Sequence, residues 1–448
     1  MKMKLLSAAL AIGLGSFVAP ASANNLADIY MLALENDPQL LRAAAERDAA
    51  KSGVDISRAD WWPQIGFSMN YSDRETDNVD WNDTFTSYNI VSSSSTSLTS
   101  EISLSQTVFN LRTWQGTEIE EKRAYQSEVN YLLARQQLML RVTQAYFTVL
   151  SAVDGLEFAQ AEKRAIERQL EQTRQRFSVG LTAITDVHEA QAQFDNALAQ
   201  EIQAQNQVEI ALEGLREITG RQFTSVDVLN TEIFSTSRPD PDGVERWIEL
   251  AHDRNLELLV RRSGVEVADQ QIDLARAGHY PTVSLNASYS DASQDSRGRS
   301  ISGLNTSSIG LRAEVPIYSG GRTLATTEQA RNNYVAASQT LEESRRSVER
   351  SVRTAYFDVV AAISSIQALE QAVISAESAL NATQAGFEVG TRTIVDVLNS
   401  TRNLFNARRN LSEARYNYIN RSLALQQAAG IISERDLLAI NEGLTDPE

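Results

Sequence analysis

Internal duplication is the feature that most constrains how this 448-residue chain can fold. The segment 143–150 (TQAYFTVL) resembles the segment 353–360 (RTAYFDVV), which lies 210 residues later. The same offset of 210 relates 177–187 (FSVGLTAITDV) to 387–397 (FEVGTRTIVDV). A constant offset between separated matches indicates a repeated structural unit. The chain therefore consists of two copies of one plan.

Proline is absent from two long stretches of the chain, which predicts very long helices. The stretches 64–238 and 317–446 contain no proline, and the whole chain has only 8 prolines and 21 glycines. Within them lie 111–178 and 321–388, which are rich in the good helix formers Ala, Gln, Glu, Arg and Leu. A helix of roughly 67 residues would be about 100 Å long. Such a length is typical of coiled assemblies rather than of ordinary globular domains.

A shorter helix is predicted after each long one, over 185–219 and 395–429. Apolar and small residues recur there at alternating steps of three and four, which favours coiled-coil packing. The alternative is ordinary core packing along each seam. Glu201 and Arg421 occupy seam positions that a closed two-helix core would not favour.

These boundaries predict the organisation of the whole chain. Each repeat opens with a helix near 24–60 or 244–279 and closes at Gly220 or Gly430, glycines also related by the 210-residue offset. The expected parts are a segment removed on export (1–23), a first repeat (24–220), a connector with two prolines (221–243), a second repeat (244–430) and a C-terminal segment (431–448).

Short runs of alternating polarity interrupt the helical pattern in both repeats. After Pro63, apolar residues alternate with polar ones through Tyr71, and the same pattern follows Pro281, 218 residues later. Alternation with a period of two predicts strands with one apolar face. We therefore expect strand pairs at about 61–110 and 280–318. Polar loops are expected within them at about 73–97 and 291–306.

The predicted strands are typical of a membrane barrel that one chain cannot complete. Their polar face carries Ser, Thr, Asn, Glu and Arg, and aromatic residues lie near the strand ends, as in the girdles of membrane barrels. An open sheet edge cannot sit in lipid. Single-chain membrane barrels begin at eight strands, whereas this chain has four. Copies must therefore combine: a dimer gives a filled eight-stranded barrel, and a trimer gives twelve strands with room for a conduit. The edge of a soluble sandwich is the alternative.

The N-terminus is typical of a secretory signal peptide. Lys2 and Lys4 precede an apolar stretch, 5–18, and Ala21 and Ala23 fit a cleavage site with small residues. A membrane anchor is the alternative, but the apolar stretch is shorter than the ~20 residues that a span requires. No later run of 18 consecutive apolar residues occurs, so we expect export without a transmembrane helix.

Composition argues against several classes of protein. The 58 acidic residues exceed the 41 Lys and Arg and give a net charge of −17, which disfavours nucleic acid as a partner. The absence of cysteine excludes disulfides, Cys–zinc sites and catalytic thiols. Three scattered histidines offer little for a metal site, and no nucleophile elbow or phosphate loop is present. We therefore expect no enzyme, no cofactor and no metal.

The duplicated plan and the motifs at 177–187 and 388–398 resemble the TolC-type outer-membrane factor family over essentially the whole mature chain. The resemblance implies a homotrimeric, 12-stranded β-barrel in the outer membrane of a Gram-negative bacterium, with lipid around it. A long α-helical coiled-coil barrel would continue it into the periplasm, with 221–243 and 431–448 around its equator.

In function, the resemblance implies a passive exit duct for tripartite efflux and type I secretion. Such a duct opens at its periplasmic end when it docks to a periplasmic adaptor (membrane fusion) protein and an inner-membrane RND or ABC-type pump. The alternative is an exported soluble coiled-coil scaffold or adhesin without a pore. A lipoprotein duct is disfavoured because no cysteine follows the signal segment.

The resemblance also implies roles for residues at the periplasmic tips. Asp396 matches the acidic position that rings the closed entrance, while Asn399 stands where some relatives carry a second Asp. Arg392 matches the arginine that holds the tips closed, with Asp186 and Thr185 as acceptors in the other repeat. N-terminal capping of a helix is the alternative role for Asp396.

Two further features of the tips complete the expected site. Phe387 stands where some relatives carry Tyr, so a link through a hydroxyl is not available there. Both Val-Gly turns match the positions where adaptor hairpins dock, although simple helix C-capping would explain them as well. The docking residues are Val179, Gly180, Leu181, Val389, Gly390 and Thr391.

Overall fold

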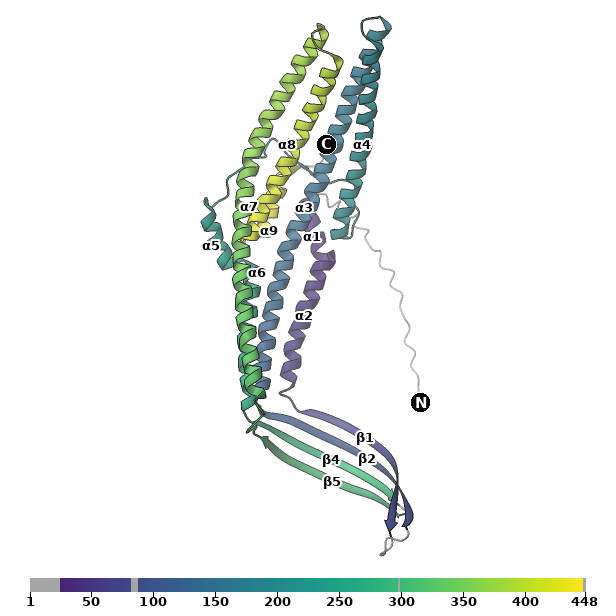
Figure 1. Cartoon of the computed structure of the whole chain (residues 1–448), viewed down its shortest axis with the longest axis vertical. Helices are drawn as coiled ribbons and strands as arrows, with labels where there is room; N and C mark the ends of the chain where they lie inside the picture. The colour runs from purple at the N-terminus through teal and green to yellow at the C-terminus, as the bar shows by residue number, and fades with distance from the viewer. Residues whose placement is uncertain (1–24, 82–87, 297–298, 446–448) are drawn as a thin grey trace, which may run out of the picture.

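The chain forms a long helical body with one curved β-sheet at its end (Figure 1). This computed structural model describes residues 25–81, 88–296 and 299–445. The predicted signal segment, 1–23, lies outside the described residues. The helices run along the long axis of the molecule, and the sheet bends away from that axis (Figure 1).

Two very long helices run the length of the helical body. They are α3 (Leu111–Ser178) and α7 (Arg322–Glu388). Each turns back at its distal end into a shorter partner, α4 (Ile184–Thr219) after α3 and α8 (Ile394–Ala428) after α7. These pairs form two hairpins whose tips lie at the end of the molecule opposite the sheet (Figure 1).

Two of the remaining helices continue the lines of α4 and α8 toward the sheet. The segments expected as single helices each divide in two, giving α1 (Leu26–Asn36) and α2 (Pro38–Ala59), then α5 (Val244–Arg254) and α6 (Leu256–Arg276). The breaks fall at Asp37 and Asn255, whose side chains accept hydrogen bonds from backbone N–H groups three residues ahead and so cap α2 and α6.

The ends of α4 and α8 meet these breaks. Gly220, after α4, lies beside Asn36, and Gly430, just beyond α8, lies against the backbone of Arg254 and Asn255. Consequently α2 continues the line of α4, and α6 continues the line of α8. With α3 and α7 they make four helical columns per chain, the same number as the strands of the sheet.

The four-stranded antiparallel sheet has the order β1-β2-β4-β5. Its strands are β1 (Gln64–Trp81), β2 (Tyr88–Asn110), β4 (Thr282–Ser296) and β5 (Arg299–Glu314). The prediction of polar loops at 73–97 and 291–306 is wrong, because most of these residues continue the strands. Serine and threonine tolerate the extended backbone well, and their hydroxyls bond across the ladder, as Ser72 and Ser97 do at 2.8 Å.

One face of the sheet is apolar and uncovered. The register aligns Ile65, Leu104, Ala287 and Ile309 across all four strands, and Ile65 and Ile309 are 72% and 78% exposed. The next row, on the other face, contains only Gly66 and three serines. Among the described strands, β1 and β5 each lack a partner on one side.

The main hydrophobic core lies around the middle of the helical body. It joins α3 to α1, α5, α8 and the short α9 (Glu434–Asn441), with Tyr146 and Phe147 fully buried. The connector and the C-terminal segment meet here through β3 (Val228–Leu229) and β6 (Leu444–Thr445). Arg141 donates two hydrogen bonds to the carboxylate of Asp37. This equatorial packing fixes the two repeats together.

Glu201 and Arg421, the two polar residues predicted at seam positions, form hydrogen bonds instead of packing in an apolar core. Lys163 donates to Glu201 at 2.6 Å, and Arg421 donates to the backbone oxygen of Asp358 at 3.3 Å. By length and composition, α7 also contains a window apolar enough to cross a membrane, although it has no run of 18 consecutive apolar residues. That window is only 17% buried in the single chain.

Candidate functional site

The candidate site lies at the tips of the two hairpins. Both turns have the same geometry, because Gly180 and Gly390 adopt positive φ angles of 78° and 81°. The N–H of the residue after each glycine bonds back to a carbonyl of the helix, from Leu181 to Arg176 and from Thr391 to Gly386, both at 2.8 Å. Glycine serves here because a side chain would strain a positive φ angle.

Apolar side chains point into solvent at both turns. Val179, Leu181 and Val389 are 69%, 68% and 76% exposed. Capping requires only the glycines and the backbone, so these side chains contribute nothing to closing the helices. Exposed apolar groups gathered at an extremity are typical of a surface that contacts another protein.

Asp396 caps its own helix within the single chain. Its carboxylate accepts hydrogen bonds from the backbone N–H and the hydroxyl of Thr393, and Thr393 accepts one from the N–H of Asp396 in return. This is a complete capping box at the start of α8. The two hydrogen bonds from Thr393, and to a lesser degree the charge of Arg392, lower the pKa of Asp396. The carboxylate is therefore held in its charged form.

Asn399 lies one turn further along α8. Its side-chain oxygen accepts a hydrogen bond from the guanidinium of Arg402 at 2.8 Å. A neutral amide at this place adds no charge to that of Asp396.

The predicted gate residues do not meet within one chain. Among the described residues no ion pair joins Arg392 to Asp186; Asp186 instead accepts a hydrogen bond from the hydroxyl of Thr182. The side chain of Arg392 lies over Gly386, where an added Cβ would come within 2.7 Å of its Cγ. Thr185 is exposed.

A different pair connects the two hairpins near their tips. The guanidinium of Arg176, in the last turn of α3, stacks on the ring of Phe387, near the end of α7, at 4.8 Å from the ring centroid. Below it, a small hydrophobic cluster draws on all four tip helices: Ile166, Leu170, Ala190, Ala197, Ile394 and Leu398, with Phe194 and Phe387 against it. Sequence reasoning noticed Phe387 only for its missing hydroxyl and did not identify Arg176.

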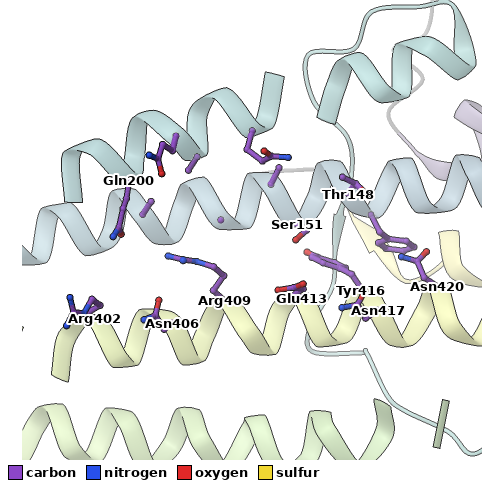
Figure 2. Close-up of a pocket in the computed structure, with 17 residues that line it drawn as sticks. Thr148, Ser151, Gln200, Arg402, Asn406, Arg409, Glu413, Tyr416, Asn417 and Asn420 are labelled. Atoms are coloured by element: carbon purple, nitrogen blue, oxygen red, sulfur yellow. The ribbon is translucent and has the colours of Figure 1, made fainter. Parts of the chain in front are cut away.

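A polar cavity between α3, α4 and α8 was also missed by the sequence reasoning. It holds about 630 Å³, and Figure 2 shows Arg402, Arg409 and Tyr416 projecting from the side of α8 that faces α3. Glu162 is buried next to Arg409, 3.9 Å away, and burial raises its pKa. The available signal was the row of polar residues Arg402, Asn406 and Arg409 along α8, spaced four and three residues apart. Among the described residues, no cluster of His, Asp and Glu could hold a metal ion.

The family of the chain follows from comparison with known proteins. Residues 29–221 and 247–431 match the family described as Outer membrane efflux protein. The two matched stretches cover the two repeats, and the gap between them covers the connector.

Relatives match over nearly the full length. The outer membrane protein TolC of Vibrio cholerae is 45% identical over 98% of each chain. The alkaline protease secretion protein AprF of Pseudomonas aeruginosa is 31% identical and covers 93% of this chain and 86% of its own. The fold also matches the CmeC outer membrane channel of Campylobacter jejuni, with a TM-score of 0.76, 17% identity and coverage of 99% of this chain and 98% of that one. The chain therefore belongs to the outer membrane efflux protein family.

Proposed function

We propose that three copies of this chain form a passive exit duct that carries substrates through the outer membrane of a Gram-negative bacterium. The observation that carries the proposal is the incomplete sheet, which has an apolar outer row, a polar inner row and two open edges. Backbone groups at an open edge cannot be left unpaired in lipid, so identical copies must close the barrel. A soluble scaffold or adhesin would leave the apolar face without a function.

The duct acts in efflux and in type I secretion. The resemblance to AprF, which is named for secretion of alkaline protease, supports the second role. Outer-membrane factors of this family work with adaptors and inner-membrane pumps. The partners we propose are a periplasmic adaptor and an RND or ABC-type pump. The chain needs no catalytic activity of its own, because the pump supplies the energy.

The adaptor docks on the two Val-Gly turns. Their exposed apolar side chains, Val179, Leu181 and Val389, support this role, because neither helix end requires them. The two turns lie at the same end of the molecule (Figure 1), so one adaptor hairpin could engage both.

Arg392 holds the tips closed by pairing with Asp186 and Thr185 of a neighbouring chain. Two facts support a link between chains: Arg392 and Asp186 do not pair within one chain, and both side chains lie at the hairpin tips. An Arg–carboxylate link between exposed groups contributes roughly 0–1 kcal/mol. Such a weak link suits a gate that a docking partner has to open.

Asp396 forms the constriction of the closed entrance, with Asn399 beside it. Three symmetry-related carboxylates would concentrate negative charge and favour cations. The hydrogen bonds from Thr393 lower the pKa of Asp396 within each chain, which opposes the rise in pKa that repulsion among the three carboxylates would cause.

Single-channel recording in planar bilayers tests both assignments. Arg392→Ser and Asp186→Ala should each raise conductance, whereas Arg168→Ser, at an exposed arginine on α3 away from the tip, should leave it unchanged. Asp396→Asn should reduce cation preference without a comparable rise in conductance. Unchanged conductance in both gate variants would contradict the proposed gate, and unchanged cation selectivity in Asp396→Asn would contradict the proposed ring of carboxylates.

A further inference from the structure

Two arginines share a cavity where the sheet meets the helices. The cavity holds about 540 Å³ and lies between α3, α6 and α7. Arg112 enters it from the first turn of α3, and Arg322 enters it from the first residue of α7. The other lining residues are neutral: Gln271, Leu274, Ala275, Gly278, Pro316, Ser319, Thr323 and Thr326.

Neither guanidinium is occupied elsewhere. Within the described ranges, the exposed side chains of Arg112 and Arg322 form no ion pair and no hydrogen bond, although most of the ion pairs in this acidic chain contain an arginine. The acidic residue closest along the cavity wall of α6, Asp273, is paired with Arg276 at 3.0 Å. The cavity therefore combines two positive charges with no carboxylate in its lining.

The two arginines occupy equivalent positions in the two repeats. Arg112-Thr113 and Arg322-Thr323 are related by the same offset of 210 residues that relates the repeats. Two glycines with positive φ, Gly320 and Gly321, precede Arg322 and turn the chain from β5 into α7. The positive ends of the dipoles of α3 and α7 point to the same place and add to the charge of the guanidiniums.

The cavity is complete within one chain. Its floor is α6, which packs against both α3 and α7 and so is an inner column of the protomer. Gly278 lets the 3-10 turn that follows α6 (Ala277–His279) approach Thr323 closely, since an added Cβ would stand 3.1 Å from the threonine Cγ2. A neighbouring copy is not needed to build the site.

We propose that this cavity binds a phosphate group, which Arg112 and Arg322 hold from two sides. Guanidinium groups bind phosphate oxygens with paired, charge-assisted hydrogen bonds. The volume falls in the range of cavities that hold small ligands, about 300–1,000 Å³. The site lies beside the ends of β2 and β5, with the ring cluster of Trp61, Phe109 and Trp114 at the same level. This is the level at which the barrel of the proposed function leaves the membrane.

The phosphate has two possible sources, and binding measurements on the purified trimer separate them. In one arm, inorganic phosphate is titrated into delipidated, detergent-solubilised protein and followed by calorimetry. In the other arm, the protein is placed in nanodiscs of phosphatidylglycerol, and retained lipid is counted by native mass spectrometry. Saturable binding in the first arm alone assigns a soluble phosphate, and retention of three lipids per trimer assigns a lipid headgroup.

The variants decide whether the arginines are responsible. Each of Arg112→Gln and Arg322→Gln should weaken binding about tenfold, and the double variant should abolish it. Arg→Lys at both positions should lose less, because lysine keeps the charge but not the forked geometry. Arg168→Gln, at an exposed arginine of α3, serves as the control and should bind normally.

Trimer mass and thermal stability are measured for every variant, so that loss of binding is read only on folded protein. All of these variants lie outside the gate, so the duct should still conduct. No binding in either arm, or equal binding by the folded double variant, would overturn the proposal without affecting the proposed function.

Discussion

The two hairpins have the same arrangement of helices, but buried residues extend closer to the tip along the long helix of the first hairpin than along that of the second. Buried residues continue along α3 as far as Thr173, close to the helix end at Ser178. Along α7 the last buried residue is Ile366, although the helix continues to Glu388. The first hairpin is therefore packed almost to its tip by contacts within the chain, and the distal part of α7 is not.

This difference indicates where the neighbouring copy belongs. α7 packs against α6 and α8 but is an outer column of the protomer, with apolar side chains such as Phe357 and Ile374 left 58% and 57% exposed. We expect its apolar window, only 17% buried in the single chain, to be covered by another chain rather than by a membrane. The distal face of α7 should be covered only in the trimer.

The equatorial breaks differ in the same way. Gly220 has φ of 71° and open space around it, with Asn36 Cβ 3.9 Å from the position of an added Cβ. Gly430 has φ of 75°, and an added Cβ would come within 2.6 Å of the Cα of Asn255. The second repeat is thus tight at its equator, and its long helix α7 is open toward the tip, although α8 is buried as far as Ile394 at its own tip end.

The largest expected effect comes from replacing each of these glycines with alanine. Gly220→Ala should cost about 1 kcal/mol for the positive φ alone. Gly430→Ala should cost clearly more, because the backbone of α5 and α6 must also move. Thermal unfolding of the purified trimers measures both. Equal losses in the two variants would contradict the asymmetry of the equator.

The next effect concerns the open face of α7. Ile374→Asp should dissociate the trimer, because it places a charge where we expect an apolar contact between chains. Ser365→Asp lies on the opposite side of the same helix and is also exposed, so the trimer should persist. Mass measurement of the detergent-extracted protein distinguishes the two results. An intact trimer in Ile374→Asp would place this surface outside the interface.

A smaller effect is expected at the contact between the hairpins. Arg176→Gln and Phe387→Leu each remove the stacking of the guanidinium on the ring, worth about 1 kcal/mol between these partly buried side chains. The tips should separate more readily, which raises the frequency of open events in bilayers. Arg174→Gln, two residues away and without a ring contact among the described residues, is the control. If the control opens as often, the stacking does not restrain the tips.

The smallest effect is a pH-dependent gain in stability. Burial raises the pKa of the Glu162 carboxyl in the folded protein, so folding favours its protonated form. The folded protein therefore loses stability as the pH rises from the ordinary glutamate range through that raised pKa. Glu162→Gln should therefore raise the unfolding temperature at neutral pH and leave it unchanged below the ordinary range. A fall in unfolding temperature at neutral pH would show that the attraction of Arg409 outweighs burial.

Sequence patterns predict the elements of this fold better than their ends. The long helices follow from the absence of proline and from the glycines of the turns, both of which are local signals. The strands continue past Ser72 because serine and threonine pair across the ladder, although their polarity resembles that of a loop. The Asp37-Pro38 pair indicates a helix start and therefore a break between α1 and α2, because proline is favoured at the first position of a helix. Asn255 is not followed by a proline, so the sequence indicates the second break less strongly.

The site was predictable only where a motif is contiguous. The turns and Asp396 lie in continuous motifs, and the capping box at Thr393 is encoded within four residues. The contact of Arg176 with Phe387 joins residues from different repeats, and no local pattern encodes it. The same holds for the cavity that Arg112 and Arg322 share.

The central claim is that one chain supplies a third of a continuous wall and that identical copies supply the rest. Its most direct test is native mass measurement of the purified, membrane-extracted protein, with the same sample reconstituted into planar bilayers. The account predicts three chains per particle and a cation-preferring conductance that rises in Arg392→Ser. A stable monomer that passes no ions would contradict it.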